Sequence, residues 1–342
     1  MSRSPDLWVP FAFICLVLTA AVSLCCGRYG LAPDDVVAVL LHPLGLGGEP
    51  RDPAATAIML ELRIPRMVAA ILIGAALAAS GVTYQAAFRN PLVSPGLLGV
   101  LAGAGFGAAV AIVLGFSATF RMTLSFVVGG AAVGVGILIA TTFGSTNLGR
   151  GDQGILLLVF GGLVSTALFT ALLAMVKFIA DPDGALPDIV FWLLGSLAEI
   201  RSATLVLMGP LLVIAIGLLL GNARFLDILV LSDDEALSLG VAAPKIRLFV
   251  IVIATISCAL TVALAGTIGW VGLVIPHVAR LLVGPAHSRL MPMAICLGGI
   301  FLLVCDLLAR SVTVSEIPIG ILTDLIGVIA FIAVLPRVRR WM

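Results

Sequence analysis

Few side chains of this 342-residue chain could carry chemistry, because only 11% of its residues are charged. The carboxylates nearest to its long apolar runs are Asp306 and Asp324, and His277 follows Pro276 at an expected helix break. An ionisable group inside a membrane span is costly and indicates function by default. Asp306 lies four residues before Arg310, so we expect a local ion pair there. Asp324 could line a polar pathway or accept a hydrogen bond within a helix pair, and a lone histidine is more often structural than a ligand or proton relay.

The other candidates for chemistry do not form a catalytic or metal-binding group. The only lysines are Lys177 and Lys245, and neither lies in a phosphate-binding GxxxxGK[ST] loop. His42 and His287 lie in expected loops and form no metal constellation. The cysteines show no CxxC spacing and indicate small apolar packing residues: Cys15, Cys25, Cys26, Cys258, Cys296 and Cys305. We expect no enzyme activity, metal or cofactor in this chain alone, and its net charge of +1 does not indicate a nucleic-acid partner.

The elements that position these groups belong to a membrane protein, because 61% of the residues are hydrophobic and the mean hydropathy is +1.24. Apolar runs of about 20 residues predict membrane spans. We predict one all-α polytopic domain over residues 1–342, with about ten spans. They are expected at 7–26, 64–88, a run ending near 114, 122–143, 155–179, 203–220, 249–264, a run ending near 283, 290–308 and 317–335. Residues 187–197 are too short to span and predict an interfacial helix.

The expected spans form two related blocks, spans 2–5 and spans 7–10. In each block a long span runs into a proline-containing break, at Asn90-Pro91-Leu92 and at Val274-Ile275-Pro276, and a shorter run with glycines follows. A glycine-rich stretch at 266–272 also interrupts the second block. Inverted repeats with broken helices at matching positions are typical of transporters. An even number of spans places both termini on one side, and most of the 19 lysines and arginines are inside if that side is cytoplasmic.

The longest polar interruption, residues 222–248, contains a compact helix signal. Ser232 can cap a helix N-terminus, and Glu235 three residues later completes a capping box. Gly240 is a natural stop just past the last turn. The spacing predicts a short helix at about 233–239, on the cytoplasmic side.

Charge and exposure allow two interpretations of this short helix. Asp233 and Asp234 place negative charge at the positive end of the helix dipole. The apolar members Ala236, Leu237 and Leu239 have no core of their own to enter. The helix is either an ordinary amphipathic loop helix that lies on the membrane or a docking knob for a separate soluble subunit.

Three arginines from distant parts of the sequence are expected at the outer surface. Arg63 and Arg66 are three residues apart, on one face at the mouth of span 2, and Arg310 lies between spans 9 and 10. They could be interfacial arginines whose charged ends reach the headgroups. Alternatively, they form a basic ring that receives acidic groups from an external partner, and their convergence on one surface favours this second interpretation.

Several stretches, in order along the chain, resemble one family. They are LRIPR at 62–66, RNPLVSPGLLG at 89–99, SDDEALSLGV at 232–241, GTIGWVGLVIPHVAR at 266–280 and EIPIG at 316–320. The chain resembles, from about residue 61 to 336, the permease subunits of bacterial ABC importers for iron–siderophore complexes, haem and cobalamin, which have the type II importer fold.

The resemblance implies ten helices, a homodimer, a bacterial inner membrane and both termini in the cytoplasm. Two cytoplasmic ATPase subunits, which carry the ATP and magnesium, would dock on the capped helix of the two permeases. The coupling residues implied are Ser232, Asp233, Asp234, Glu235, Ala236, Leu237, Leu239 and Gly240. A periplasmic or lipid-anchored binding protein would present acidic residues to Arg63, Arg66 and Arg310.

The resemblance also implies a substrate path along the dimer axis, lined mainly by helices 5 and 10. The path residues implied are Phe160, Val164, Leu168, Ile321 and Asp324. The cytoplasmic gate implied is the loop before helix 5, with Asn147, Arg150 and Asp152. A mostly apolar wall of this kind would pass a bulky chelate without trapping it.

Helix 10 departs from the family pattern, because Asp324 stands where related permeases commonly carry a small neutral residue. A carboxylate that faces the path would disfavour an anionic chelate and favour a neutral or cationic one. Ferric siderophore is the first expectation for the substrate, and cobalamin and haem follow. The rival hypothesis is an ion-coupled secondary transporter with Asp324 or His277 as the proton site, but such a carrier needs neither the capped helix nor the outer arginines.

Overall fold

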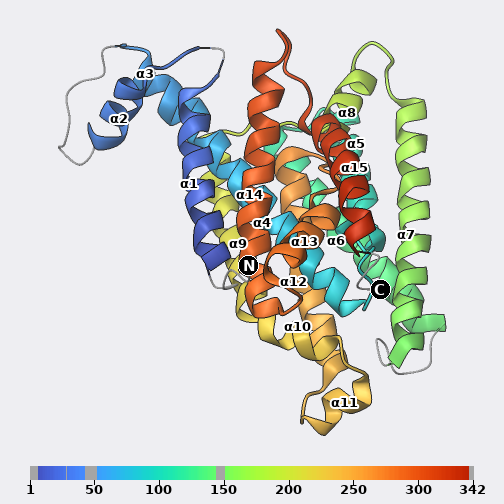
Figure 1. The fold of residues 1–342 in the computed structure, drawn as a ribbon. Helices are drawn as coiled ribbons and strands as arrows, with labels where there is room; N and C mark the ends of the chain where they lie inside the picture. Colours follow the sequence, from blue (N-terminus) through green and yellow to red (C-terminus); the bar gives the residue numbers. More distant parts are fainter. Residues whose placement is uncertain (1–6, 28, 43–51, 144–150, 339–342) are drawn as a thin grey trace.

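The computed structural model describes residues 7–27, 29–42, 52–143 and 151–338, and every regular element among them is helical (Figure 1). The elements in chain order are α1 (Trp8–Cys25), α2 (Pro33–Leu41), α3 (Ala55–Ala57), the π-helical turn η3 (Ile58–Arg63), α4 (Ile64–Ala87), the 3-10 turn η4 (Pro95–Leu98), α5 (Val100–Val113), α6 (Ala118–Phe143), α7 (Gly151–Ile179), α8 (Ala185–Leu193), α9 (Ser202–Gly221), α10 (Ala223–Leu229), α11 (Asp233–Ser238), α12 (Ala243–Ala265), α13 (Val271–Val283), α14 (His287–Ser311) and α15 (Ile319–Val338). The predicted all-α class is confirmed.

Within these described ranges, seven helices are long and apolar enough to cross a membrane. They are α1, the continuous helix from α3 to α4, α6, α7, α9, α12 and α14. The shorter apolar helices α5, α13 and α15 account for the remaining expected spans. The interfacial helix expected at 187–197 is α8, which begins and ends a few residues earlier.

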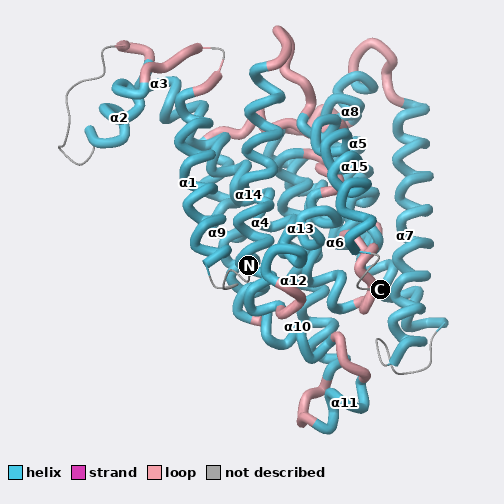
Figure 2. The backbone as a smooth tube through the Cα atoms, viewed as in Figure 1, coloured by secondary structure: helices cyan, strands magenta, loops and turns pink. Residues whose placement is uncertain are grey.

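Loops gather at the two ends of the helix bundle, and the two ends differ (Figure 2). The short helix α11 projects from one end, below α10, whereas α2, α3 and α8 lie toward the opposite end (Figure 1). The first turn of α1 and the last described turn of α15 point toward the α11 end. We call these two ends the α11 end and the distal end.

The centre of the bundle is formed by α4, α12 and α14. In the most apolar windows of these helices, 78%, 78% and 61% of the residues are buried, against 22–33% for α1, α6, α7 and α9. Small residues let α4 and α14 approach closely: a Cβ added to Gly74 would lie 2.2 Å from the Gly298 carbonyl oxygen, and one added to Gly298 would lie 2.3 Å from the Gly74 oxygen. The central helices therefore pack backbone to backbone.

We predict that Gly74→Ala destabilises the protein, because the new methyl group would meet backbone that has no room to move. Overpacking of this kind costs about 1–3 kcal/mol, which corresponds to a melting temperature lower by on the order of 5 °C. The measurement is the melting temperature of the detergent-solubilised protein, with the folded fraction after heating monitored by size-exclusion chromatography. Gly217→Ala on α9 is the control, since a Cβ there meets nothing within 4 Å. Equal melting temperatures for the two variants would contradict the prediction.

The second predicted break lies earlier than Pro276. The helix α13 runs continuously from Val271 to Val283 with Pro276 inside it, and the chain breaks at 266–270, where Gly266 and Trp270 have φ angles of 72° and 63°. Proline cannot donate to the carbonyl four residues before it, here that of Gly272. The α4 backbone covers this carbonyl, since a Cβ at Gly81 would lie only 1.9 Å from the Gly272 oxygen. Glycine at position 81 therefore lets α4 pack directly against this carbonyl.

His277 is consequently in the interior of α13, not at a break. Its Nδ1 lies 2.8 Å from the Leu273 carbonyl oxygen, and its ring meets Phe331 edge to face with centroids 5.9 Å apart. These contacts agree with the structural interpretation of this histidine. His287, expected in a loop, is the first residue of α14.

Span 2 does not begin near residue 64, as its apolar run suggested. The helix continues upstream through η3 and α3 to Ala55. The π-helical turn at Ile58–Arg63, in which each N–H bonds to the carbonyl five residues before it, joins α3 to α4. This turn lies just before Pro65, which has no N–H group to donate. The start of α4 is therefore a rigid support for Arg63 and Arg66.

Candidate functional site

The helix α11 carries the predicted capping box. The Glu235 backbone N–H donates to Ser232 Oγ at 3.3 Å, and the Ser232 N–H donates to Glu235 Oε2 at 2.8 Å. The hydroxyl and N–H of Ser232 hold the pKa of the Glu235 carboxyl below its usual range. A lowered pKa stabilises the folded cap above the unfolded pKa of the carboxyl, and this contribution is lost only as the pH falls through the lowered folded value. The cap is therefore fully formed at neutral pH.

The C-terminus of α11 ends one residue earlier than expected, at Ser238, and has a Schellman motif. Gly240 has a φ of 76°, its N–H donates to the Leu237 carbonyl at 2.9 Å, and the Val241 N–H donates to the Ala236 carbonyl at 3.0 Å. A glycine fits this left-handed position without strain. Both ends of this short helix are thus fixed by local bonds.

We predict that Ser232→Ala loosens α11 without unfolding the protein. Loss of an N-cap costs about 1 kcal/mol, so amide hydrogen exchange at 233–236 should become about fivefold faster. Hydrogen exchange read by mass spectrometry measures this. Ser238→Ala is the matched control, because its hydroxyl bonds only to the Glu235 carbonyl in the last turn. Unchanged exchange in the Ser232 variant would mean that the cap does not hold the helix.

Asp233 anchors α11 to the bundle, which the sequence did not reveal. Its Oδ1 accepts a hydrogen bond from Arg89 at 2.6 Å and another from Arg247 at 3.0 Å. Arg89 follows α4 and also donates from Nε to the Leu229 carbonyl at 3.0 Å, and Arg247 in α12 is 1% exposed. One carboxylate therefore joins the short helix to two central helices. Both arginines lie at ends of expected spans, but only the fold shows that they meet.

The apolar members of α11 divide between two faces. Ala236 is fully buried in the main core, which corrects the expectation that it has no core to enter. Leu237 and Leu239 are 60% and 62% exposed, and Asp234 is exposed beside them. The outward face therefore offers two leucines and an acidic edge on a helix whose inward face is held firmly.

The helix α10, which the sequence did not predict, connects the same region to α14. Asp227 of α10 accepts from the His287 backbone N–H at 3.0 Å, and its Oδ1 lies 2.7 Å from His287 Nδ1. The carboxylate thus satisfies a free N–H at the N-terminus of α14. Residues 222–242 are therefore bonded to α12, to α14 and, through Arg89, to the end of α4.

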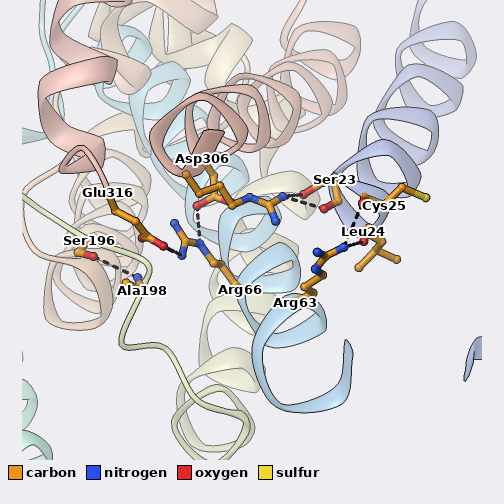
Figure 3. A network of polar contacts seen from close by, with 10 residues as sticks. Ser23, Leu24, Cys25, Arg63, Arg66, Ser196, Ala198, Asp306 and Glu316 are labelled. Atoms are coloured by element: carbon orange, nitrogen blue, oxygen red, sulfur yellow. Dashed lines mark hydrogen bonds and ion pairs between the residues drawn. The ribbon is translucent and has the colours of Figure 1, made fainter. Parts of the chain in front are cut away.

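At the distal end, a network of ions surrounds the buried carboxylate of Asp306 (Figure 3). Arg66 donates from Nε to Asp306 Oδ1 at 2.7 Å and from Nη1 to Glu316 Oε2 at 3.0 Å. Arg310 Nε lies 3.3 Å from Asp306 Oδ2, which confirms the ion pair predicted for these two residues. The Asp306 side chain is 1% exposed, whereas those of Arg66 and Glu316 are 14% and 32% exposed.

Arg63 and Arg310 do not form the free basic ring expected from the sequence. Both are buried, and their guanidinium groups bond to the last turn of α1. Arg63 donates to the carbonyls of Leu24, Cys25 and Tyr29. Arg310 donates to the carbonyl and hydroxyl of Ser23 at 2.7 and 2.6 Å. The physical reason is that a helix C-terminus leaves carbonyl groups without partners, and the two arginines satisfy them.

The residues implied for the path lie on uncovered faces of α7 and α15. Phe160, Val164 and Leu168 on α7 are about half exposed, and Ile321 and Asp324 on α15 are exposed as well. The helix α7 packs on α5 and α6, whereas α15 packs on α13 and α14, so each presents a free face. Their role in a path stays a prediction.

The implied gate falls almost entirely outside the described residues. Asn147 and Arg150 belong to the stretch that the structure does not describe, and Asp152 is in the first turn of α7 with its side chain not described. Over the described ranges, no group of three histidine, cysteine or acidic side chains could hold a metal ion.

Comparison with known proteins gives relatives along the whole chain. It is 36% identical to the molybdate import system permease of Haemophilus influenzae, over 98% of each chain. It is 34% identical to the hemin transport system permease of Yersinia pestis, over 98% of this chain and 97% of the relative. A solved structure, an inward-facing conformation of a putative metal-chelate type ABC transporter, has a TM-score of 0.83 and 35% identity and covers 96% of this chain and 98% of its own.

The model of the FecCD transport family matches residues 15–337. This match takes in α4 with its arginines, the capped helix α11, the helix α7 and nearly all of α15. The chain is therefore an ABC importer permease that belongs to the FecCD transport family.

Proposed function

We propose that this permease moves a bulky metal chelate into the cytoplasm, with a ferric siderophore as the first candidate and cobalamin and haem as the next. ATP would be hydrolysed on magnesium by two copies of a separate ABC ATPase subunit. The observation that carries this proposal is α11, a doubly capped helix with two exposed leucines and a buried anchor. A hemin permease and a metal-chelate transporter among the relatives support the class of substrate.

The contacts of α11 supply a path for mechanical coupling. Asp233 binds Arg89 at the end of α4, and Asp227 binds His287 at the start of α14. The same two helices meet at the distal end, where Arg66 of α4 binds Asp306 of α14. A movement of α11 would therefore be carried to both ends of the α4–α14 pair, a pair that tight glycine contacts hold together.

We further propose that two copies of this chain place α7 and α15 around a common axis in the inner membrane, with both termini and α11 in the cytoplasm. The distal end would then receive a periplasmic or lipid-anchored binding protein. Arg66 is the arginine best placed to meet it, because its side chain and that of its partner Glu316 are still partly exposed.

The test is ATP hydrolysis and uptake in liposomes by the permease purified together with a candidate ABC ATPase. The arms contain no binding protein, or a binding protein loaded with a ferric siderophore, cobalamin or haem. Stimulation by one loaded binding protein, with uptake of the same chelate, supports the proposal and names the substrate. Uptake driven by a pH gradient without an ATPase would support an ion-coupled secondary transporter and refute it.

A further inference from the structure

Asp324 is an ionisable group on an otherwise apolar helix face. It is exposed, and from Ile319 to Val334 no other residue of α15 can ionise. The uncovered face of α7 is also free of ionisable residues from 154 to 176. The exposed neighbours of Asp324 on α15 are aliphatic: Ile321, Leu325, Val328, Ile329 and Ile332.

The Asp324 carboxylate has no partner within the described part of the chain, since no hydrogen bond or ion pair joins it to another described residue. Other acidic groups of the bundle behave differently: Asp306, Asp233 and Asp227 each bind an arginine or a histidine. A partner for Asp324 must therefore come from water, from another molecule or from a residue outside the described ranges.

Glycines on both sides of the contact let α15 approach the break before α13 closely. A Cβ at Gly269 would lie 2.4 Å from Asp324 Oδ1, so the carboxylate rests against the backbone of this break. One turn further along α15, a Cβ at Gly327 would lie 2.4 Å from the Cβ of Trp270 in the same break. Two close contacts therefore seat the part of α15 that carries Asp324 on the break before α13.

This placement disfavours lipid as the surroundings of Asp324. An unpaired carboxylate in the hydrocarbon region is costly, and ionisable residues in spans face water-filled cavities or a partner. The apolar residues around Asp324 offer neither a cation nor hydrogen-bond donors. The carboxylate therefore faces an aqueous space, and in the proposed dimer that space is the path.

We propose that Asp324 selects substrate by charge, and that this permease carries a metal chelate with net positive charge and rejects anions. This inference rests on the proposed function. A single fixed carboxylate in a low-dielectric wall attracts cations and repels anions, as charged rings in channels do. The related molybdate permease is named for an oxyanion, so the two proteins would differ in the charge of what they carry.

The first experiment measures the charge preference at this site directly. In a background without native cysteines, Ile321→Cys and Val328→Cys each place a reactive thiol on α15, about one turn before and one turn after Asp324. Their rates of modification by a cationic and an anionic methanethiosulfonate are compared in membranes that contain the full-length chain. We expect the cation-to-anion rate ratio to fall about tenfold when Asp324→Asn is added. Leu237→Cys on α11 is the control, and its ratio should not change.

The second experiment measures uptake by the assembled transporter with a binding protein for each probe. The probes are a ferric hydroxamate with a free ammonium group, a ferric catecholate with net negative charge, and molybdate. We expect uptake of the cationic chelate, and Asp324→Asn should reduce its rate by about fivefold or more. The same variant should not reduce the uptake rates of the two anionic probes.

The two experiments separate the two proposals. If no probe is transported with ATP, the proposed function fails, but the modification ratio still reports whether Asp324 sets the charge of the site. A ratio that does not respond to Asp324→Asn, or transport of an anion at the same rate by both forms, overturns charge selection even if ATP-driven import is found.

Discussion

Leu237→Asp should abolish ATP-driven uptake while leaving the permease folded. The Leu237 side chain is 60% exposed, so a charged residue there costs little in the isolated chain. At a docking interface the same position would be desolvated, and an unpaired carboxylate would be buried next to Asp234. The loss of an interface hot spot is worth about 2 kcal/mol or more, which corresponds to a weakening of about 30-fold. The measurements are co-purification of the ATPase subunit and uptake in liposomes.

The control for this variant is Val37→Asp on α2, which adds the same charge at the distal end. Val37 is 52% exposed, close to the value for Leu237. It lies outside the coupling stretch and outside the arginine network, so the ATPase subunit should co-purify as it does with the unmodified protein. If both variants keep the ATPase bound and transport equally well, α11 is an ordinary surface helix and the docking interpretation is wrong.

Local signals in the sequence predicted α11 well, because they depend on residues only a few positions apart. Ser232, Glu235 and Gly240 make their cap contacts within the helix or its last turn. The contacts that hold α11 on the bundle were missed, since Arg89 is 144 positions away from Asp233. A charge at the end of an apolar run gives no information about which distant carboxylate it meets.

The arginines at the distal end show that the sequence predicts their location better than their burial. Arg63, Arg66 and Arg310 lie together as the sequence predicts, but no sequence pattern shows that Arg63 and Arg310 are buried. The two arginines are buried because the terminal carbonyl groups of α1 lack partners within the helix and accept hydrogen bonds from Arg63 and Arg310.

The helix break predicted at Pro276 is misplaced because it also depends on a contact with a distant part of the chain. Gly81 lets α4 cover the carbonyl that the proline leaves without a helical donor, and no pattern within α13 records that neighbour.

Asp306→Ala should be among the most destabilising single changes in the chain. Its side chain is 1% exposed and compensates two guanidinium groups, those of Arg66 at 2.7 Å and Arg310 at 3.3 Å. Removal of one partner from a buried ion pair costs about 3–5 kcal/mol, because the remaining charges are left without compensation. We expect a large fall in the melting temperature and in the yield of monodisperse protein in detergent.

Glu316→Ala is the matched control, because Glu316 binds the same guanidinium group of Arg66 at 3.0 Å but is 32% exposed. A pair that stays in contact with water contributes about 0–1 kcal/mol, so this variant should melt close to the unmodified protein. The two variants share Arg66 but differ in burial, and Asp306 also compensates Arg310, so the comparison measures what the buried centre of the network contributes beyond its exposed edge. Equal losses of stability would show that the network acts as one surface cluster, and that Asp306 is not the buried centre that joins α4 to α14.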